Sequence, residues 1–361
     1  MKKTRKQIIA ILLVSSLLVT SLTGCGKKPK TPPTSSNNQN QTTSQNSSQD
    51  AVTTEINPFT GLPSTKEALT NRPVAIMVNN IIASLPQAGI SSADIIFELP
   101  VEGPITRLMA VFADYTKMPK MGSIRSARHD YVELMKPFNP IYVHFGGSAA
   151  GTQAIKDNKI QDIDGISMSR IGFVQDKKRA ETMAREHTWF TDVDHVKAAM
   201  TKLKIGGKVT QPTKNMFEFS DSDTMASYEK ATPATSATVK MSGSCTATFT
   251  YDEATKLYKK GQYGKPHIDT NVNKACAVKN VLVMYTEVGL LPNGKNKEVN
   301  LSKGKGFYLS NGKKIDVTFE KKSVNDYLSV KDSQGNPLKL NKGQTWVSIA
   351  PIGNYSATAV K

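Results

Sequence analysis

The first 56 residues of this chain consist of three segments that cannot contribute to a folded core. A basic start, Lys2 to Lys6, precedes an uncharged apolar run over residues 8–22 that is too short to span a membrane comfortably as a permanent helix. Residues 30–50 contain no apolar side chain except prolines, so they cannot bury enough surface to offset the entropy of ordering them. Any stable domain must therefore be built from the residues after 56.

The junction between these segments carries the pattern Leu22-Thr23-Gly24-Cys25. Small residues before the cysteine suit an extended chain in a peptidase site, and the thiol can form a thioether with a diacylglyceryl group. We therefore expect residues 1–24 to be a lipoprotein signal peptide and Cys25 to carry the lipid, rather than an ordinary signal with a chance cysteine. Residues 25–56 would be the lipidated cysteine and a disordered tether on the extracytoplasmic face of the cell membrane, with a reach on the order of 30 Å.

The charge of the chain is strongly positive and unevenly distributed. Removing the four basic residues of the first 24 lowers the formal net charge from +17 to +13. Export argues against nucleic acid as the partner, because lipid headgroups and wall polymers are the polyanions outside the membrane. Every arginine after residue 24 lies in the first half, whereas residues 256–322 contain 14 lysines, no arginine and 5 acids. Since arginine suits bidentate contacts with phosphate or carboxylate, a specific anion site is expected in the first half.

The segment 57–225 alternates predicted strands with predicted helices. Helices are expected over residues 128–135, after Ser148, and from residue 191 onward, with Thr191 or Asp192 as the cap. This alternation predicts an N-terminal layered α/β domain. Strands are expected over residues 74–78, 94–99, 105–113, 121–125 and 141–145.

The segment 235–361 has the pattern of a mainly antiparallel β domain. Its clearest signal is the pair Asn311-Gly312 between two apolar runs, which predicts a tight hairpin. The fold class is therefore α+β or α/β, with the β-rich domain second. Cys245 and Cys276 both fall here, and outside the cytoplasm they could form one disulfide or remain two separate buried thiols. Other strands are expected over residues 246–251, 281–285 and 345–349.

The strongest candidate site lies where several predicted strands of the first domain end. Arginines occur in the third strand and where the fourth passes into a helix, whose free N–H groups also favour an anion. The strand over residues 141–145 runs into a glycine turn, which can bring backbone amides close to phosphate oxygens. Ligands of open α/β sheets bind at the carboxyl ends of strands. We therefore expect an anion-binding site that contains Arg107, Arg125, Arg128, His144, Gly146, Gly147 and Ser148.

A purely structural interpretation of the same residues is equally open. Arg107 could pair with Glu98 or Glu102, Arg125 could pair with Asp130, and the glycines could form a plain turn. The first-half acids could instead gather a divalent ion, although their spacing matches no cation loop; they are Asp94, Glu98, Glu102 and Asp130. We find no Cys/His cluster, G-x-S-x-G elbow, P-loop or H-E-x-x-H motif. Neither a metal site nor a cofactor is therefore expected.

Several short blocks of the sequence occur in the same order in one known family. They are residues 57–63, 72–80, 93–98, 101–107, 122–128 and 144–148, followed by residues 264–269, 304–306 and 340–346. On these blocks the chain resembles the YerB-like family of bacterial lipoproteins, a two-domain family without an established activity. The family's usual Pro-His-Asn is replaced by Glu186-His187-Thr188, so a role that rests on that asparagine does not carry over.

Three functions are compatible with these patterns. The first is a membrane-anchored, non-enzymatic protein that binds a phosphate-bearing ligand or partner of the cell envelope. The second is a wall-polymer phosphotransferase, because residues 107–128 are similar in pattern to LytR-type enzymes that act on lipid-linked pyrophosphate. The arginines would then neutralise the pyrophosphate, and Asp94 or Glu102 would hold magnesium. The third is an envelope scaffold that makes only protein contacts.

Overall fold

The computed structural model describes residues 55–361. The predicted signal peptide, the predicted lipid attachment at Cys25 and nearly all of the predicted tether lie outside the described residues. Within the described range, no helix is both long enough and apolar enough to cross a membrane.

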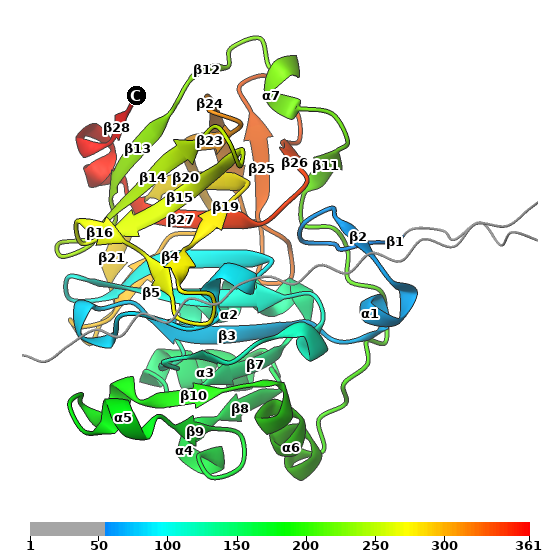
Figure 1. Cartoon of the computed structure of the whole chain (residues 1–361), viewed down its shortest axis with the longest axis vertical. Coiled ribbons are helices and arrows are strands. Elements are labelled where there is room, and N and C mark those ends of the chain that lie inside the picture. Colours follow the sequence, from blue (N-terminus) through cyan, green and yellow to red (C-terminus); the bar gives the residue numbers. More distant parts are fainter. Residues whose placement is uncertain (1–54) are drawn as a thin grey trace, which may run out of the picture. The chain divides into compact units, whose positions relative to one another are not determined.

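An eleven-stranded mixed sheet runs through the described chain (Figure 1). Its strands are, in spatial order, β12 (Thr232–Pro233), β24 (Lys313–Glu320), β23 (Lys303–Ser310), β20 (Asn280–Thr286), β27 (Thr345–Pro351), β4 (Ile95–Glu102), β5 (Ile105–Phe112), β3 (Val74–Asn79), β7 (Ile141–His144) and β8 (Asp162–Asp164), with β25 (Ser329–Asp332) paired to β24. Every residue of β3 and β20 is buried. Such continuous burial is typical of strands that are covered on both faces of a sheet.

The two halves of the chain meet inside this sheet. β27, from the second half, lies parallel to β4 of the first half, with Thr345 opposite Ile95 and Ser348 opposite Glu98. On its other side, β27 is parallel to β20. The described residues accordingly form one compact unit, in which two consecutive domains share a sheet.

The strand directions are less uniform than the sequence pattern predicted. In the first half β5 is antiparallel to both β3 and β4, whereas β3, β7 and β8 are parallel, so this half is a mixed sheet rather than a plain layered α/β domain. In the second half the predicted hairpin joins β23 to β24, and Asn311 and Gly312 have φ angles of 46° and 71°. Two positive φ values are what a two-residue type I′ turn requires. The described chain as a whole has more strand than helix, and its helices are concentrated in the first half.

The helices are short, and Asp192, one of the two predicted caps, directly precedes the longest of them. Ser148 Oγ accepts a hydrogen bond from Gly151 N at 3.0 Å, and the Asp192 carboxylate accepts one from His195 N at the same distance. These bonds satisfy N–H groups that have no partner within a helix. The α-helices are α1 (Lys66–Thr70), α2 (His129–Met135), α3 (Ala149–Asp157), α4 (Gly165–Met168), α5 (Lys177–Ala180), α6 (Val193–Leu203) and α7 (Thr224–Ser227).

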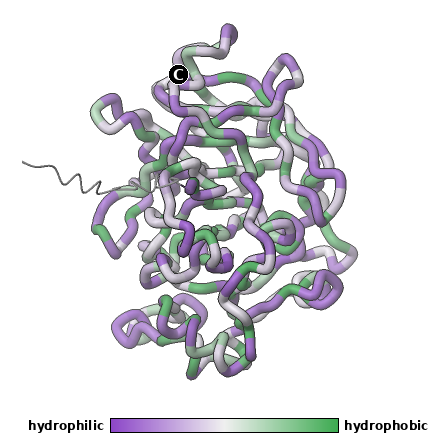
Figure 2. The backbone as a smooth tube through the Cα atoms, turned by 90° about the vertical axis from the view of Figure 1, so that its right-hand side faces the viewer, coloured by the Kyte–Doolittle hydropathy of each residue, from purple (hydrophilic) through white to green (hydrophobic). Residues whose placement is uncertain are grey.

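Smaller sheets and helices cover the faces of the central sheet. In the second half, a six-stranded sheet packs its inward side chains, Val239 and Phe249 among them, into one apolar core with Val283 of β20. In the first half, α2 packs Tyr131 and Leu134 against the opposite face. Hydrophilic segments lie largely at the outer loops in Figure 2. The six strands are β16 (Lys265–Pro266), β15 (Leu257–Gln262), β14 (Thr246–Asp252), β13 (Ser236–Lys240), β28 (Ala359–Val360) and β19 (Ala277–Val278).

The remaining strands form short local pairs. The predicted strand over residues 121–125 is reduced to β6, which pairs with β10 and leaves Arg125 in irregular chain. These strands are β6 (Met121–Gly122), β10 (Trp189–Thr191), β9 (Val174–Gln175), β1 (Glu55–Ile56), β2 (Pro63–Ser64), β11 (Glu218–Ser220), β26 (Lys339–Asn341), β17 (Ile268–Asp269), β18 (Lys274–Ala275), β21 (Val288–Leu290) and β22 (Lys297–Val299).

A buried polar network joins the two halves beside the β27–β4 pair. The Glu98 carboxylate accepts hydrogen bonds from Asn80 Nδ2, Thr106 Oγ1 and Trp346 Nε1, each at 3.1 Å. Lys260 Nζ lies 3.7 Å from Glu98 Oε2 and 4.8 Å from the centre of the Trp346 ring. Both charged side chains are fully buried. A carboxylate from the first half is thus neutralised by a lysine from the second.

Asp130 makes a second buried link between the halves. Its Oδ1 accepts a hydrogen bond from the N–H of Val299, in β22, at 3.0 Å. Burial, together with the nearby carboxylates of Glu133 and Glu298, outweighs the opposing effect of the Val299 bond and raises the pKa of Asp130 to about 7. The carboxyl group therefore retains its proton close to neutral pH.

The two cysteines of the second half are free thiols, so the predicted alternative of a Cys245–Cys276 disulfide is not what the structure contains. Each sulfur faces a different group of the first half. Cys245 Sγ lies 3.6 Å from Glu98 Oε1, and Cys276 Sγ accepts from Ser91 Oγ at 3.5 Å. Burial raises the pKa of Cys245 to about 12 and that of Cys276 to about 11. Both thiols are therefore packed in their protonated, unreactive form.

Candidate anion-binding site

Arg125 lies at the carboxyl ends of two parallel strands, as the sequence predicted for the site. Its backbone N–H donates to the carbonyl of Met77 in β3 at 2.9 Å, and its carbonyl accepts from Phe145 N, directly after β7, at 3.0 Å. These bonds hold the irregular segment after β6 across the sheet edge. The structure therefore places this arginine where open sheets of this kind bind ligands.

Arg107 and Arg128 lie close together but share one carboxylate. Arg107 Nη2 is 2.9 Å and Arg128 Nη2 is 2.7 Å from the same oxygen of Glu102. Burial, reinforced by the charge of Arg128, lowers the pKa of Arg107 to about 10. Burial alone would raise the pKa of Glu102, but the two arginines outweigh that effect and hold it below its usual value. The predicted pairing of Arg107 with Glu102 is confirmed, and neither buried arginine is free to grip a ligand.

Arg125 differs from these two because its guanidinium is only weakly paired. Its Nη2 is 3.5 Å from Glu186 Oε1, and the Glu186 side chain is 56% exposed. The Nε of Arg125 is buried and has no hydrogen-bond partner among the described residues. The predicted pairing with Asp130 is wrong, because Asp130 binds Val299 instead. Arg125 thus keeps hydrogen-bonding capacity that another group can use.

The guanidinium of Arg125 opens into a cavity of about 340 Å³. One wall is aromatic, with the rings of Phe145 and Trp189 centred 5.2 Å apart. Arg185 lies over the Trp189 ring at 5.7 Å and brings a second guanidinium to the rim. We call this cavity the Arg125 pocket. It combines two cations with an apolar wall, which suits an anion that carries a flat or apolar group.

The sequence did not identify the aromatic wall. The sequence pattern predicts Phe145 only as the end of the strand over residues 141–145, and no predicted motif includes Trp189. Arg185 carried only the general signal that arginines are confined to the first half. Phe145 directly follows β7, Arg185 comes from the segment before β10 and Trp189 from β10 itself, and only the fold brings these side chains to Arg125.

The residues of the predicted glycine turn support the pocket rather than supply free donors to it. His144 Nδ1 is 2.8 Å from the carbonyl of Gly146, and its Nε2 is 2.9 Å from Asp162 Oδ2. The amide of Gly146 donates to Asp164 Oδ1 at 2.7 Å, and the amide of Ser148 donates to Ala127. Ser148 Oγ caps α3.

Gly146 and Gly147 shape the turn beside the pocket. Gly146 has a φ of +70°, and a Cβ there would lie 3.6 Å from Ile166, a pocket residue. Gly147 packs tightly, because a Cβ would approach Thr152 Oγ1 to 2.9 Å. Gly146 and Gly147 therefore form a plain tight turn, which is the structural alternative that the sequence left open. The turn lies next to Arg125 and is not shaped as an anion-binding loop.

The four acids considered as cation ligands are dispersed. Asp94 accepts from Ala113 N at 2.7 Å, Glu98 lies in the network with Lys260, Glu102 binds two arginines, and Asp130 binds Val299. Over residues 55–361, no group of three or more His, Cys, Asp or Glu side chains is arranged to hold a metal ion.

Comparisons with known proteins agree with the two-domain division. Residues 59–206 match the family described as protein of unknown function (DUF3048), N-terminal domain, and residues 237–347 match its C-terminal domain. The Bacillus subtilis (strain 168) protein named "Putative lipoprotein YerB" is 30% identical over 302 residues, which cover 81% of this chain and 86% of that protein. The crystal structure of YerB from Bacillus subtilis superposes with a TM-score of 0.74 at 24% identity, over 85% of this chain and 99% of that one.

Proposed function

The chain belongs to the DUF3048 family of YerB-like proteins, and from that premise we propose that it is an extracytoplasmic lipoprotein that binds a phosphate-bearing ligand in the Arg125 pocket. Cys25 would carry the lipid that holds it at the cell membrane. The name of the Bacillus subtilis relative supports the lipoprotein assignment.

The observation that carries the proposal is the incomplete pairing of Arg125. Arg107 and Arg128 each donate to Glu102 and to a backbone carbonyl, whereas the guanidinium of Arg125 has a single partner among the described residues, an exposed glutamate 3.5 Å away. A phosphate group supplies several acceptor oxygens and so matches a guanidinium fork. The wall of Trp189 and Phe145 would pack against whatever bears the phosphate.

Binding is favoured over phosphoryl transfer by what surrounds this pocket. The transferase interpretation needs Asp94 or Glu102 to hold magnesium beside the arginines. Glu102 already accepts hydrogen bonds from both Arg107 and Arg128, and Asp94 lines a different cavity with Phe112 and Asp114. Neither carboxylate is available at Arg125. A scaffold with protein contacts alone would leave the Arg125 pocket without a use.

We expect the R125Q variant to lose anion affinity and the E186Q variant to gain it. Losing a charged hydrogen-bond donor should weaken pyrophosphate binding about 10- to 100-fold, whereas removing the competing carboxylate should strengthen binding a few-fold. Titration calorimetry with inorganic pyrophosphate would measure both changes in the full chain, isolated in a non-ionic detergent. The thermal shift caused by the same ligand provides an independent reading.

Two controls make the result specific. R125K keeps the charge but not the planar fork, and should fall between wild type and R125Q. K197Q removes one charge from an exposed position on α6 and should bind pyrophosphate as wild type does. The proposal fails if wild type shows no stabilisation by pyrophosphate, or if R125Q and K197Q weaken binding equally.

A further inference from the structure

The Arg125 pocket contains the large apolar side chain that is most exposed in the described part of the chain. This residue is Ile166, in the first turn of α4, which lines the pocket and is 70% exposed. An exposed isoleucine alone has no meaning for function. Here, however, it lies in the same cavity as the guanidinium groups of Arg125 and Arg185. The pocket thus combines two cations with aliphatic surface that no described residue covers.

The turn after β7 fixes the position of Ile166. Asp164 Oδ1 accepts hydrogen bonds from Gly146 N at 2.7 Å and from Ile166 N at 3.0 Å. A Cβ at Gly146 would lie 3.6 Å from Ile166 Cγ1, so the isoleucine side chain lies close to this turn. Because one carboxylate oxygen binds both backbone segments, the start of α4 is held at the pocket.

Ile166 continues the aromatic wall of the pocket. A Cβ at Gly165 would overlap the Phe145 ring, so this ring lies directly against the backbone that precedes Ile166. The ring of Trp189 follows, centred 5.2 Å from that of Phe145. Both rings are half-buried. We call the side chains of Ile166, Phe145 and Trp189 the apolar strip.

The pocket has few uncharged polar groups with which to recognise a sugar or a nucleobase. Among the described residues that line it, only Ser169 has an uncharged hydroxyl or amide side chain. The hydroxyls of a sugar, or the ring nitrogens of a base, would lose water at the apolar strip without gaining partners, and this loss costs affinity. An aliphatic chain carries no such groups and is stabilised when it leaves water. The lining therefore favours an aliphatic ligand.

We propose that the ligand of the Arg125 pocket is the phosphomonoester of an aliphatic alcohol, with its phosphate on Arg125 and Arg185 and its chain over the apolar strip. This inference rests on the proposed function and names the class of compound that carries the phosphate. A terminal phosphate bears about two negative charges, which two guanidinium groups can neutralise. Because the Glu186 side chain is exposed, its carboxylate can leave Arg125 when the phosphate binds.

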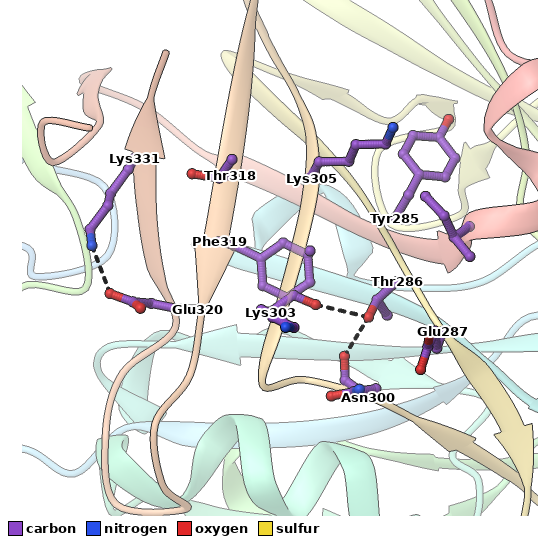
Figure 3. Close-up of a pocket in the computed structure, with 12 residues that line it drawn as sticks. Tyr285, Thr286, Glu287, Asn300, Lys303, Lys305, Thr318, Phe319, Glu320 and Lys331 are labelled. Atoms are coloured by element: carbon purple, nitrogen blue, oxygen red, sulfur yellow. Dashed lines mark hydrogen bonds and ion pairs between the residues drawn. The ribbon is translucent and has the colours of Figure 1, made fainter. Parts of the chain in front are cut away.

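A larger cavity in the second half lacks this combination of features. It measures about 570 Å³ and opens over the ends of β20, β23 and β24 (Figure 3). Two of its lysines, Lys303 and Lys305, are exposed, and Lys331 pairs with Glu320 at 2.8 Å. Its Phe319 ring is 3% exposed and packs in the core. Since hydrated surface lysines hold a phosphate only loosely, the Arg125 pocket is the stronger site for this ligand.

The test compares phosphomonoesters that differ in their alcohol. In the full chain, isolated in a non-ionic detergent, n-hexyl phosphate should bind at least about 10-fold more tightly than methyl phosphate, since each methylene buried on the apolar strip contributes about 4-fold. Ribose 5-phosphate should bind no more tightly than methyl phosphate. R125Q should weaken the binding of all three ligands. Titration calorimetry would measure these affinities.

Two serine substitutions test the contact with the chain. I166S should weaken the binding of hexyl phosphate about 5-fold and leave that of methyl phosphate unchanged, because only the longer ligand reaches this side chain. L290S removes a side chain of the same size, 52% exposed on β21, and should change neither affinity. Since both positions are exposed, thermal unfolding of the two variants should match that of wild type.

Such a ligand can come from two sources, a single-chain alcohol phosphate or a glycerolipid phosphate. Dihexanoyl phosphatidic acid is soluble and carries the same terminal phosphate on a two-chain glycerolipid. Tighter binding of hexyl phosphate would identify a single-chain ligand, and tighter binding of the phosphatidic acid would identify a glycerolipid. Either order supports the proposal.

The other outcomes overturn the inference and separate it from the proposed function. If wild type bound neither pyrophosphate nor any of the esters, both would fail. If pyrophosphate and methyl phosphate bound through Arg125 but hexyl phosphate or its analogue bound no more tightly, only the aliphatic chain would be wrong. Equal effects of I166S and L290S, or binding of hexyl phosphate that R125Q leaves unchanged, would place the chain outside this pocket. Binding to phosphatidylglycerol vesicles without binding to hexyl phosphate would assign the apolar strip to a membrane surface instead.

Discussion

Replacing Lys260 with methionine is expected to lower the free energy of unfolding by ~3–5 kcal/mol, because it leaves the Glu98 carboxylate buried without its countercharge. The methionine can keep the packing of the lysine stem against Trp346 and Phe249, so the loss reflects charge rather than volume. Urea-induced unfolding of the full chain at constant pH would measure the change.

The neighbouring residue on β15 provides a matched control. Lys259 points to the other side of the strand, where its side chain is 55% exposed and pairs with Asp252. K259M should therefore change stability by less than about 0.5 kcal/mol. In a double-mutant cycle, E98Q combined with K260M should cost less than the sum of the two single changes. If K260M and K259M changed the free energy of unfolding equally, the buried Glu98–Lys260 pair would contribute nothing to the stability of the contact between the two halves.

The second large effect is a pH dependence that originates at Asp130. Its carboxyl group ionises at about 7 in the folded protein, against the ordinary value of 3.8 in the unfolded chain. Between these values folding takes up a proton, so the stability that is present at low pH is lost as the pH rises towards 7. We expect this loss to be about 2–4 kcal/mol, since one pKa unit corresponds to about 1.4 kcal/mol.

The D130N variant tests this dependence directly. Asparagine cannot ionise but retains an oxygen that can accept the Val299 N–H, so D130N should be more stable than wild type at pH 8. The difference should shrink as the pH approaches 4. Unfolding midpoints at several pH values would show the trend, and the exposed D157N substitution on α3 should show none. If the difference in stability between D130N and wild type were the same from pH 4 to pH 8, the pH dependence could not originate at Asp130.

Helices, strands and turns that are determined by local sequence patterns could be predicted from the sequence. The apolar runs that became β3, β5 and β7, and the hairpin at Asn311-Gly312, were expected within a residue or two of their observed bounds, whereas β4 extends three residues beyond its expected end. The same holds for α6, whose Asp192 cap lies directly before its periodic apolar residues. In each case a local property, such as alternation, a positive φ or a capping oxygen, determines the element.

The pairing of distant segments could not be predicted in this way. Glu98 and Trp346 are 248 residues apart, and nothing near either residue indicates that β4 and β27 are adjacent. A run such as residues 345–349 specifies a buried strand but not its neighbour or direction. The sequence therefore indicated two separate patterns of strands, whereas the structure joins them in one sheet.

The sequence predicted where the arginines lie, but not which of them is free. The arginines lie near strand ends because Arg107 belongs to a strand and Arg125 and Arg128 precede a helix. Both placements follow from the local sequence. Which of them is free depends on Glu102 and Glu186, and the sequence offered several acids for each arginine. The aromatic wall of Trp189 and Phe145 is assembled by tertiary contacts alone. Arg125 is therefore distinguished from Arg107 and Arg128 only in three dimensions.

The central place of β27 determines when this protein can finish folding. β4 pairs with β5 on one side, but its other edge stays unpaired until residues 345–351 form β27. β20 also lacks one of its two neighbours until β27 has formed. A chain that leaves the cell residue by residue would therefore cross the membrane before its main sheet could close. For a chain exported as proposed, late closure of this kind would keep the chain unfolded enough to pass the membrane, and it would leave two apolar strand edges in need of protection until translocation ends.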